Sequence, residues 1–169
     1  MPDEPSSLRA REILRRRAVD VLPDAARVSS AHENHEAFFG GLLEAAFLVA
    51  AADGTLSKEE VGSLIDVVSD LGGEGVTPSE LAGMVYEFSS SMEKEGRQAR
   101  LDALARAVTD AAARREILGF ASLVALCDHD LAPSELFVLH SLGKAFGLDA
   151  AAVGGVINSV KAAMGEGAA

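Results

Sequence analysis

The feature that most constrains the fold is an internal repeat, in which residues 47–72 align without a gap on residues 122–147. Eight of the 26 aligned pairs are identical, and five of those eight are apolar pairs that belong to one shared core pattern. Gly72 and Gly147 form a sixth pair, at a position where glycine commonly ends a helix. The repeat therefore predicts two related helical hairpins.

Composition favours helices over strands. Hydrophobic residues make up 49% of the sequence, yet it contains one Tyr and no Trp, and no stretch alternates with the period of a strand. We expect an all-α fold in which two pseudo-repeated helical hairpin units face each other and pack into one helical bundle domain. The expected helices are 35–52, 57–71, 77–90, 100–108, 115–127, 133–146 and 150–164, with residues 93–98 as a polar connection.

The charge of the chain is unevenly placed. Residues 1–30 hold six Arg against five acidic residues, whereas residues 31–169 carry a net charge of −12. We expect residues 1–30 to be a basic N-terminal extension and residues 31–165 to be the helical domain. Because so acidic a body repels phosphates, we expect no nucleic-acid partner; the charge favours cations or basic proteins.

The sequence also bears on location. Its longest apolar run, residues 45–52, is far shorter than the roughly 20 residues of a membrane span, and the first 30 residues lack an apolar signal segment. A single cysteine, Cys127, fits a reducing compartment. We expect a cytoplasmic protein, with two interpretations of the Arg-rich start: a solubilising tail, or a peripheral contact with the anionic inner membrane.

Two acidic corners between helices form the candidate site. Asp53 and Glu60 recur as Asp128 and Glu135 at the same spacing, and Asp130 adds a carboxylate to the second corner. In one interpretation each Glu caps the helix that it begins and each Asp closes a turn. In the other, the carboxylates share a hard divalent cation, with Ca²⁺, Mg²⁺ or Mn²⁺ favoured over Zn²⁺. The second interpretation explains why each Asp follows a helix C-terminus, where an anion is disfavoured unless a cation offsets it.

The corners also carry a family resemblance. The first reads Ala-Asp-Gly-x-Leu-x-x-x-Glu from Ala52 to Glu60, and the second keeps the Asp, the Leu and the Glu but has His129 in place of the Gly. Two such corners on matching helices resemble the tellurite-resistance TerB-like family over about residues 33–160. The resemblance implies a bacterial stress-response domain, often in membrane-associated assemblies. It also implies a metal-binding or acidic interaction face at the four repeated carboxylates.

No other cluster points to catalysis. His32 and His35 do not have the spacing of the zinc-protease HExxH motif, and with Glu36 they fit a solvated first turn of a helix. Cys127 is expected to be a buried inert thiol and His140 a half-buried structural residue.

We therefore expect a non-enzymatic module that binds a divalent cation. An acidic protein–protein interaction scaffold, with the corner carboxylates acting as helix caps alone, is the alternative. A metal-dependent enzyme is a weaker third possibility. A protein partner is expected, but the sequence does not identify it.

Overall fold

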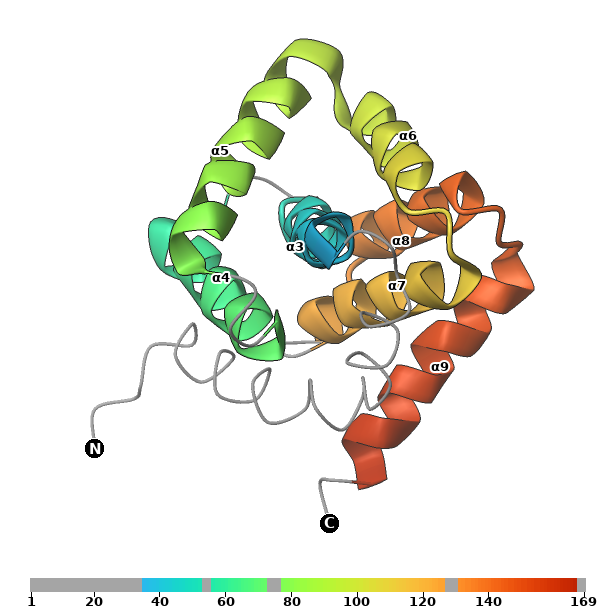
Figure 1. Ribbon diagram of the computed structural model, residues 1–169. Helices are drawn as coiled ribbons and strands as arrows, with labels where there is room; N and C mark the ends of the chain where they lie inside the picture. The colour runs from blue at the N-terminus through green and yellow to red at the C-terminus, as the bar shows by residue number, and fades with distance from the viewer. Residues whose placement is uncertain (1–34, 53–55, 73–76, 127–130, 167–169) are drawn as a thin grey trace.

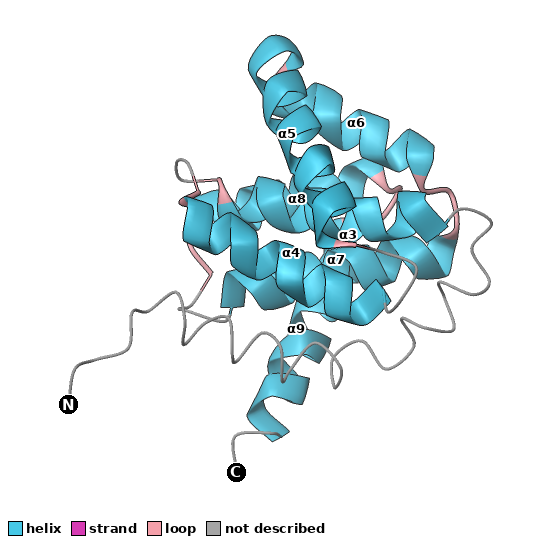
Figure 2. Ribbon diagram, turned by 60° about the vertical axis from the view of Figure 1, so that its left-hand side comes forward, coloured by secondary structure: helices cyan, strands magenta, loops and turns pink. Residues whose placement is uncertain are grey.

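The computed structural model describes residues 35–52, 56–72, 77–126 and 131–166, and these form helices joined by short connections. No strand occurs among them (Figure 2), which confirms the all-α prediction for this part of the chain. The described helices are α3 (His35–Ala50), α4 (Lys58–Gly72), α5 (Pro78–Glu95), α6 (Arg97–Ala107), α7 (Ala111–Leu126), α8 (Pro133–Ala145) and α9 (Ala150–Glu166).

Helix α3 is the centre of the fold. It contacts α4, α5, α6, α7 and α8, and Figure 1 shows it end-on with these helices around it. Its residues are apolar on every side of the helix, as expected of a helix that has no solvent-facing stripe. The buried apolar side chains of α3 are Phe38, Phe39, Leu42, Leu43, Ala45, Ala46, Phe47, Leu48 and Val49.

The last helix lies outside this arrangement. Helix α9 contacts α7 and α8 (Figure 1), and it buries Val153, Ile157 and Val160 against them. These three residues are spaced four and three apart, so they share one face of α9. The opposite face of α9 is exposed, and α9 therefore has the one-sided pattern of a covering helix.

Several helix ends follow the capping residues that the sequence predicts. The Glu80 N–H donates to Thr77 Oγ1 at 3.3 Å and the Thr77 N–H donates to Glu80 Oε2 at 3.4 Å, which is a complete capping box before α5. Asp149 caps α9 by accepting from the Ala152 N–H at 2.8 Å. Gly147, with a φ of 80°, ends α8 in the left-handed region that glycine adopts without strain.

The predicted connection at residues 93–98 is wrong. Helix α5 continues to Glu95 and α6 begins at Arg97, so Gly96 alone separates them. Gly96 has a φ of 89°, a conformation that breaks the helix in a single residue. The polar residues around it are good helix formers, and their polarity indicated exposure, not a loop.

Arg114, in the first turn of α7, binds the ends of two other helices. Its guanidinium donates to the carbonyls of Ala105 at 2.7 Å and Val108 at 2.6 Å, at the end of α6, and to the carbonyl of Phe146 at 3.0 Å, at the end of α8. The last carbonyls of a helix have no partner within the helix and carry partial negative charge. Arg114 therefore satisfies both helix ends with one cation.

The repeated segments correspond to α3 with α4 and to α7 with α8, each joined through an acidic corner. α6 contacts both α3 and α8 and lies between the two repeats in the sequence. A pseudo-symmetric relation between the two hairpins stays a prediction, as does the boundary between the N-terminal extension and the helical domain. Residues 1–30 lie outside the part of the chain that the structure describes.

Substitution of Gly41 tests the close packing of α3. A Cβ at Gly41 would lie 2.9 Å from Ile117 Cδ1 and 3.3 Å from Leu104 Cδ1, both fully or almost fully buried. We expect Gly41→Ala to lower the free energy of unfolding by about 1–2 kcal/mol, because overpacking outweighs the gain in helix propensity. Urea denaturation would measure the change.

Gly62 in α4 provides the matched control, since a Cβ there would meet no atom within 4 Å. Gly62→Ala should raise the free energy of unfolding by about 0.5–1 kcal/mol. A Gly41→Ala variant as stable as Gly62→Ala would contradict the packing of α3 described above.

Candidate functional site

The structure describes two of the five carboxylates that the sequence predicts as metal ligands. Glu60 lies in the first turn of α4 and Glu135 in the first turn of α8. Asp53, Asp128 and Asp130 lie outside the described residues. The same holds for Cys127 and for the side chains of His32, His35 and Glu36.

Glu60 is exposed and acts as part of a helix cap. Its N–H donates to Ser57 Oγ at 3.1 Å, and the Ser57 hydroxyl donates to Glu60 Oε1 at 3.1 Å. Ser57 thus caps α4 as the sequence predicts, although the carboxylate returns to the Ser57 hydroxyl in place of its backbone N–H.

Glu135 has the same place in the repeat but a different environment. Its residue exposure is 5%, and its Oε1 accepts the Ala132 N–H at 3.0 Å. Ala132 has no side-chain oxygen, so this return bond is the half of a capping box that can form here. Removing a carboxylate from water costs free energy unless hydrogen bonds or a cation compensate it. This cost is larger for the buried Glu135 than for the exposed Glu60.

The first corner has a cation of its own. Arg97, at the start of α6, donates from Nη2 to the Ala52 carbonyl at 3.5 Å, directly after the end of α3. A guanidinium at this position offsets the negative C-terminal end of the α3 dipole. Arg97 therefore supplies, at the first corner, the positive charge that a bound metal would otherwise provide.

Among the described residues, no three His, Cys, Asp or Glu side chains gather closely enough to hold a metal ion. His140 is half-buried on α8, as the sequence predicts. The metal prediction depends on three aspartates that the described part of the chain does not include, and it stays a prediction.

Glu44, which is not among the residues predicted from the sequence, lies in α3 and is 3% exposed. Arg100 on α6 donates to both of its oxygens, from Nε to Oε2 at 2.8 Å and from Nη2 to Oε1 at 3.1 Å. Burial raises the pKa of Glu44 from its usual 4.5, against the opposing effect of the Arg100 hydrogen bonds and charge. In the sequence, the signal for this ion pair is a glutamate within an apolar stretch. Its partner Arg100 cannot be inferred from that signal because it lies 56 positions away.

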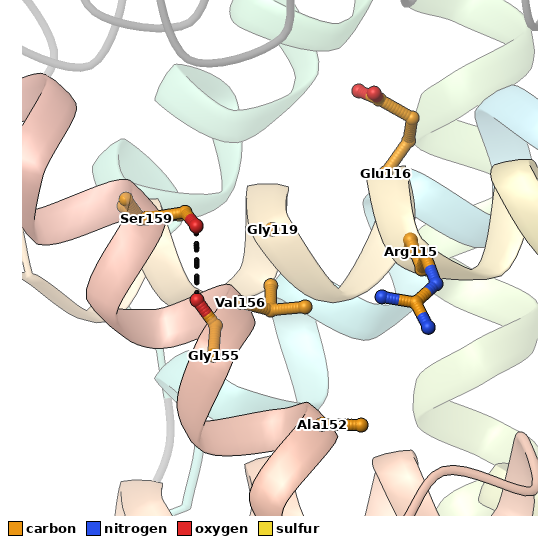
Figure 3. Close-up of a pocket in the computed structure, with 8 residues that line it drawn as sticks. Arg115, Glu116, Gly119, Ala152, Gly155, Val156 and Ser159 are labelled. Atoms are coloured by element: carbon orange, nitrogen blue, oxygen red, sulfur yellow. Dashed lines mark hydrogen bonds between the residues drawn. The ribbon is translucent and has the colours of Figure 1, made fainter.

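A cavity of about 430 Å³ opens between α7 and α9. Figure 3 shows Arg115 and Glu116 on α7 pointing in different directions, while Ser159 on α9 donates to the Gly155 carbonyl at 2.9 Å. Because that hydroxyl is engaged within its own helix, it is not placed as a nucleophile here. Neither Glu60 nor Glu135, the two predicted ligands that the structure describes, lines this cavity. Its remaining lining residues are Gly119, Ala152, Val156 and Val160.

The described residues thus define a small all-helical domain built around one buried helix, with helix caps at its acidic corners. The family model described as "Tellurite resistance protein TerB" matches residues 43–156, well over half of the chain. The protein belongs to the TerB family, which confirms the resemblance noted in its sequence. Comparison with curated proteins and with solved structures finds no significant match.

The family match covers both corners and the whole of α4 to α8. None of the described helices combines the length and the apolar character needed to span a bilayer.

Alanine substitutions at Glu60 and Glu135 should lower the free energy of unfolding by different amounts. We expect Glu135→Ala to lower the free energy of unfolding by about 1–3 kcal/mol, because the part-buried Ala132 N–H loses its acceptor. Glu60→Ala should cost about 0.5 kcal/mol, since water replaces its exposed hydrogen bonds. Thermal or urea denaturation would compare the two variants. Equal costs would contradict the difference in burial.

The Glu44 pKa gives a prediction for pH. Since the folded-state pKa lies above 4.5, the folded chain binds this proton more tightly than the unfolded chain does. The Glu44 contribution to stability is therefore fully present below the unfolded-state pKa and declines as pH rises through the folded-state pKa. We expect the stability advantage of the wild type over Glu44→Gln to be larger near about pH 4 than near about pH 7.

Denaturation at several pH values would measure this difference. Glu93→Gln, at an exposed position on α5, is the matched control for loss of one carboxylate. A wild-type advantage that grows as pH rises would show that the bond to Arg100 outweighs the cost of burial.

Proposed function

We propose that this TerB-family protein is a non-enzymatic module that binds a divalent cation at its acidic corners, as part of a tellurite-resistance type of stress response. The observation that carries the proposal is the burial of Glu135. Glu135 is 5% exposed at the start of α8, and a carboxylate shielded from water attracts a nearby cation more strongly than an exposed one does.

The second corner is the stronger candidate of the two. Asp128 and Asp130 precede Glu135 by seven and five positions, so the second corner holds three carboxylates in eight residues. Their oxygen donors suit Ca²⁺, Mg²⁺ or Mn²⁺ better than Zn²⁺. At the first corner Glu60 is exposed and Arg97 already supplies positive charge, so Asp53 and Glu60 should contribute less to binding.

An acidic interaction scaffold is the second candidate. It is favoured by the capping hydrogen bonds of Glu60 and Glu135, which give both residues a structural role without a metal. Leu136 and Phe137, which follow Glu135 on α8, are 38% and 68% exposed and offer an apolar contact beside the acidic corner. In this reading a basic protein partner binds at the second corner. We place both candidates in the cytoplasm, with peripheral contact at the inner membrane as an option for residues 1–30.

Thermal melts of the chelator-treated chain with Ca²⁺, Mg²⁺, Mn²⁺ or Zn²⁺ test the cation proposal. A specific ion at roughly 100 times its Kd should add about 2.7 kcal/mol to the free energy of unfolding, a shift of several degrees. The double variant Asp128→Asn with Asp130→Asn should lose this shift, and Asp53→Asn should reduce it by less.

Asp102→Asn, at an exposed position on α6, is the matched control and should keep the full shift. A flat response to all four ions would overturn cation binding and leave capping as the role of the glutamates. An equal loss of shift in the control would assign the effect to net charge alone.

A further inference from the structure

A second cavity, of about 310 Å³, lies between α3, α5 and α6, and neither Glu60 nor Glu135 is among its lining residues. Its volume is at the lower end of the range for small-molecule sites. Gly40 and Met84, which both line the cavity, approach closely: a Cβ at Gly40 would lie 3.3 Å from Met84 Sδ. Figure 1 shows α5 and α6 meeting at one end above α3, so the cavity lies inside the angle of this pair.

One wall of the cavity is a buried ion pair. Glu44, 3% exposed, accepts two hydrogen bonds from Arg100 at 2.8 and 3.1 Å, and the Arg100 guanidinium carbon lies 5.9 Å from the centroid of the Phe88 ring. Arg100 is therefore held between a carboxylate and an aromatic face. Such a pair is rigid, and it presents its remaining polar surface at a fixed place in the cavity.

The balance of charge at the cavity is negative. Arg100 is neutralised by Glu44, and the exposed carboxylate of Glu87 on α5 also lines the cavity. Glu95, further along α5, acts on Arg100 as well, since its charge helps to raise the Arg100 pKa. An entering anion would meet these acids with no uncompensated cation among the described lining residues.

The apolar lining of the cavity favours a ligand with a short alkyl chain. Met84, Phe88 and Leu104 provide side chains against which a short alkyl chain can pack, and Ala and Gly residues leave room for it. Methionine adapts well to flexible aliphatic chains. The cavity therefore combines an acidic end with a narrow apolar space.

We infer that this cavity binds a small alkylammonium or alkylguanidinium group, whose cation contacts the carboxylate of Glu87 and whose alkyl stem packs on Met84 and Phe88. The group belongs either to a free amine or to the side chain of a lysine or arginine. The inference does not depend on the corners: the cavity lies on α3, α5 and α6, and the proposed metal ligands lie before α4 and α8 or in the first turns of these helices.

Titration of the full chain with n-pentylamine, followed by amide NMR, tests the inference. We expect shifts at cavity residues and saturable binding, with pentanoate and pentanol, which have the same stem, binding at least about tenfold more weakly. A lysine blocked at both backbone ends is a second probe. Tighter binding of that probe assigns the group to a protein side chain, and tighter binding of pentylamine assigns it to a free amine.

Two variants leave the buried ion pair in place. Glu87→Gln should weaken pentylamine binding about tenfold, as expected for loss of one charged partner, and Ala103→Leu should block the cavity with a good helix former. The matched control, Glu93→Gln on the same helix, removes an equal charge outside the cavity and should bind as the wild type does. Equal binding of pentanoate, an equal loss in Glu93→Gln, or no saturable shifts at cavity residues would overturn the inference.

Discussion

The burial of α3 on all its sides is the constraint on which the rest of the structure depends. A helix that is apolar around its whole circumference has to be covered from every direction, and α4, α5, α6, α7 and α8 provide that cover. Within the buried stretch 38–49 the one charged residue is Glu44. Arg100 compensates it from α6, so the same contact that allows an acid in the core also fixes α6 against α3.

Much of this fold follows from local sequence signals. Apolar periodicity and capping residues predicted the described helices because these signals act within one or two turns. The junction at Gly96 was missed, since polar residues in a helix and in a loop look alike in composition. The bond from Arg100 to Glu44 spans 56 positions, and only the packing of α6 brings the two together. Pairs of this kind have no local signature.

The corners show the limit of a repeat as a guide to function. Glu60 and Glu135 occupy equivalent positions in the repeat, yet Glu60 is exposed and Glu135 is buried, with 5% of its surface exposed. The exposure of each glutamate depends on the helices packed around its corner, which the repeated residues do not specify. Two copies of one motif can thus keep their residues while their environments differ.

Arg114 has a consequence for how the protein opens. Because one side chain occupies the terminal carbonyls of α6 and α8, neither of these ends can fray without breaking bonds that also hold the other. Fluctuations that in most helices begin independently at each terminus are joined here into one local event. The ends of α6 and α8, together with the start of α7, therefore form a single cooperative unit, whose backbone amides should exchange with solvent at a common, slow rate.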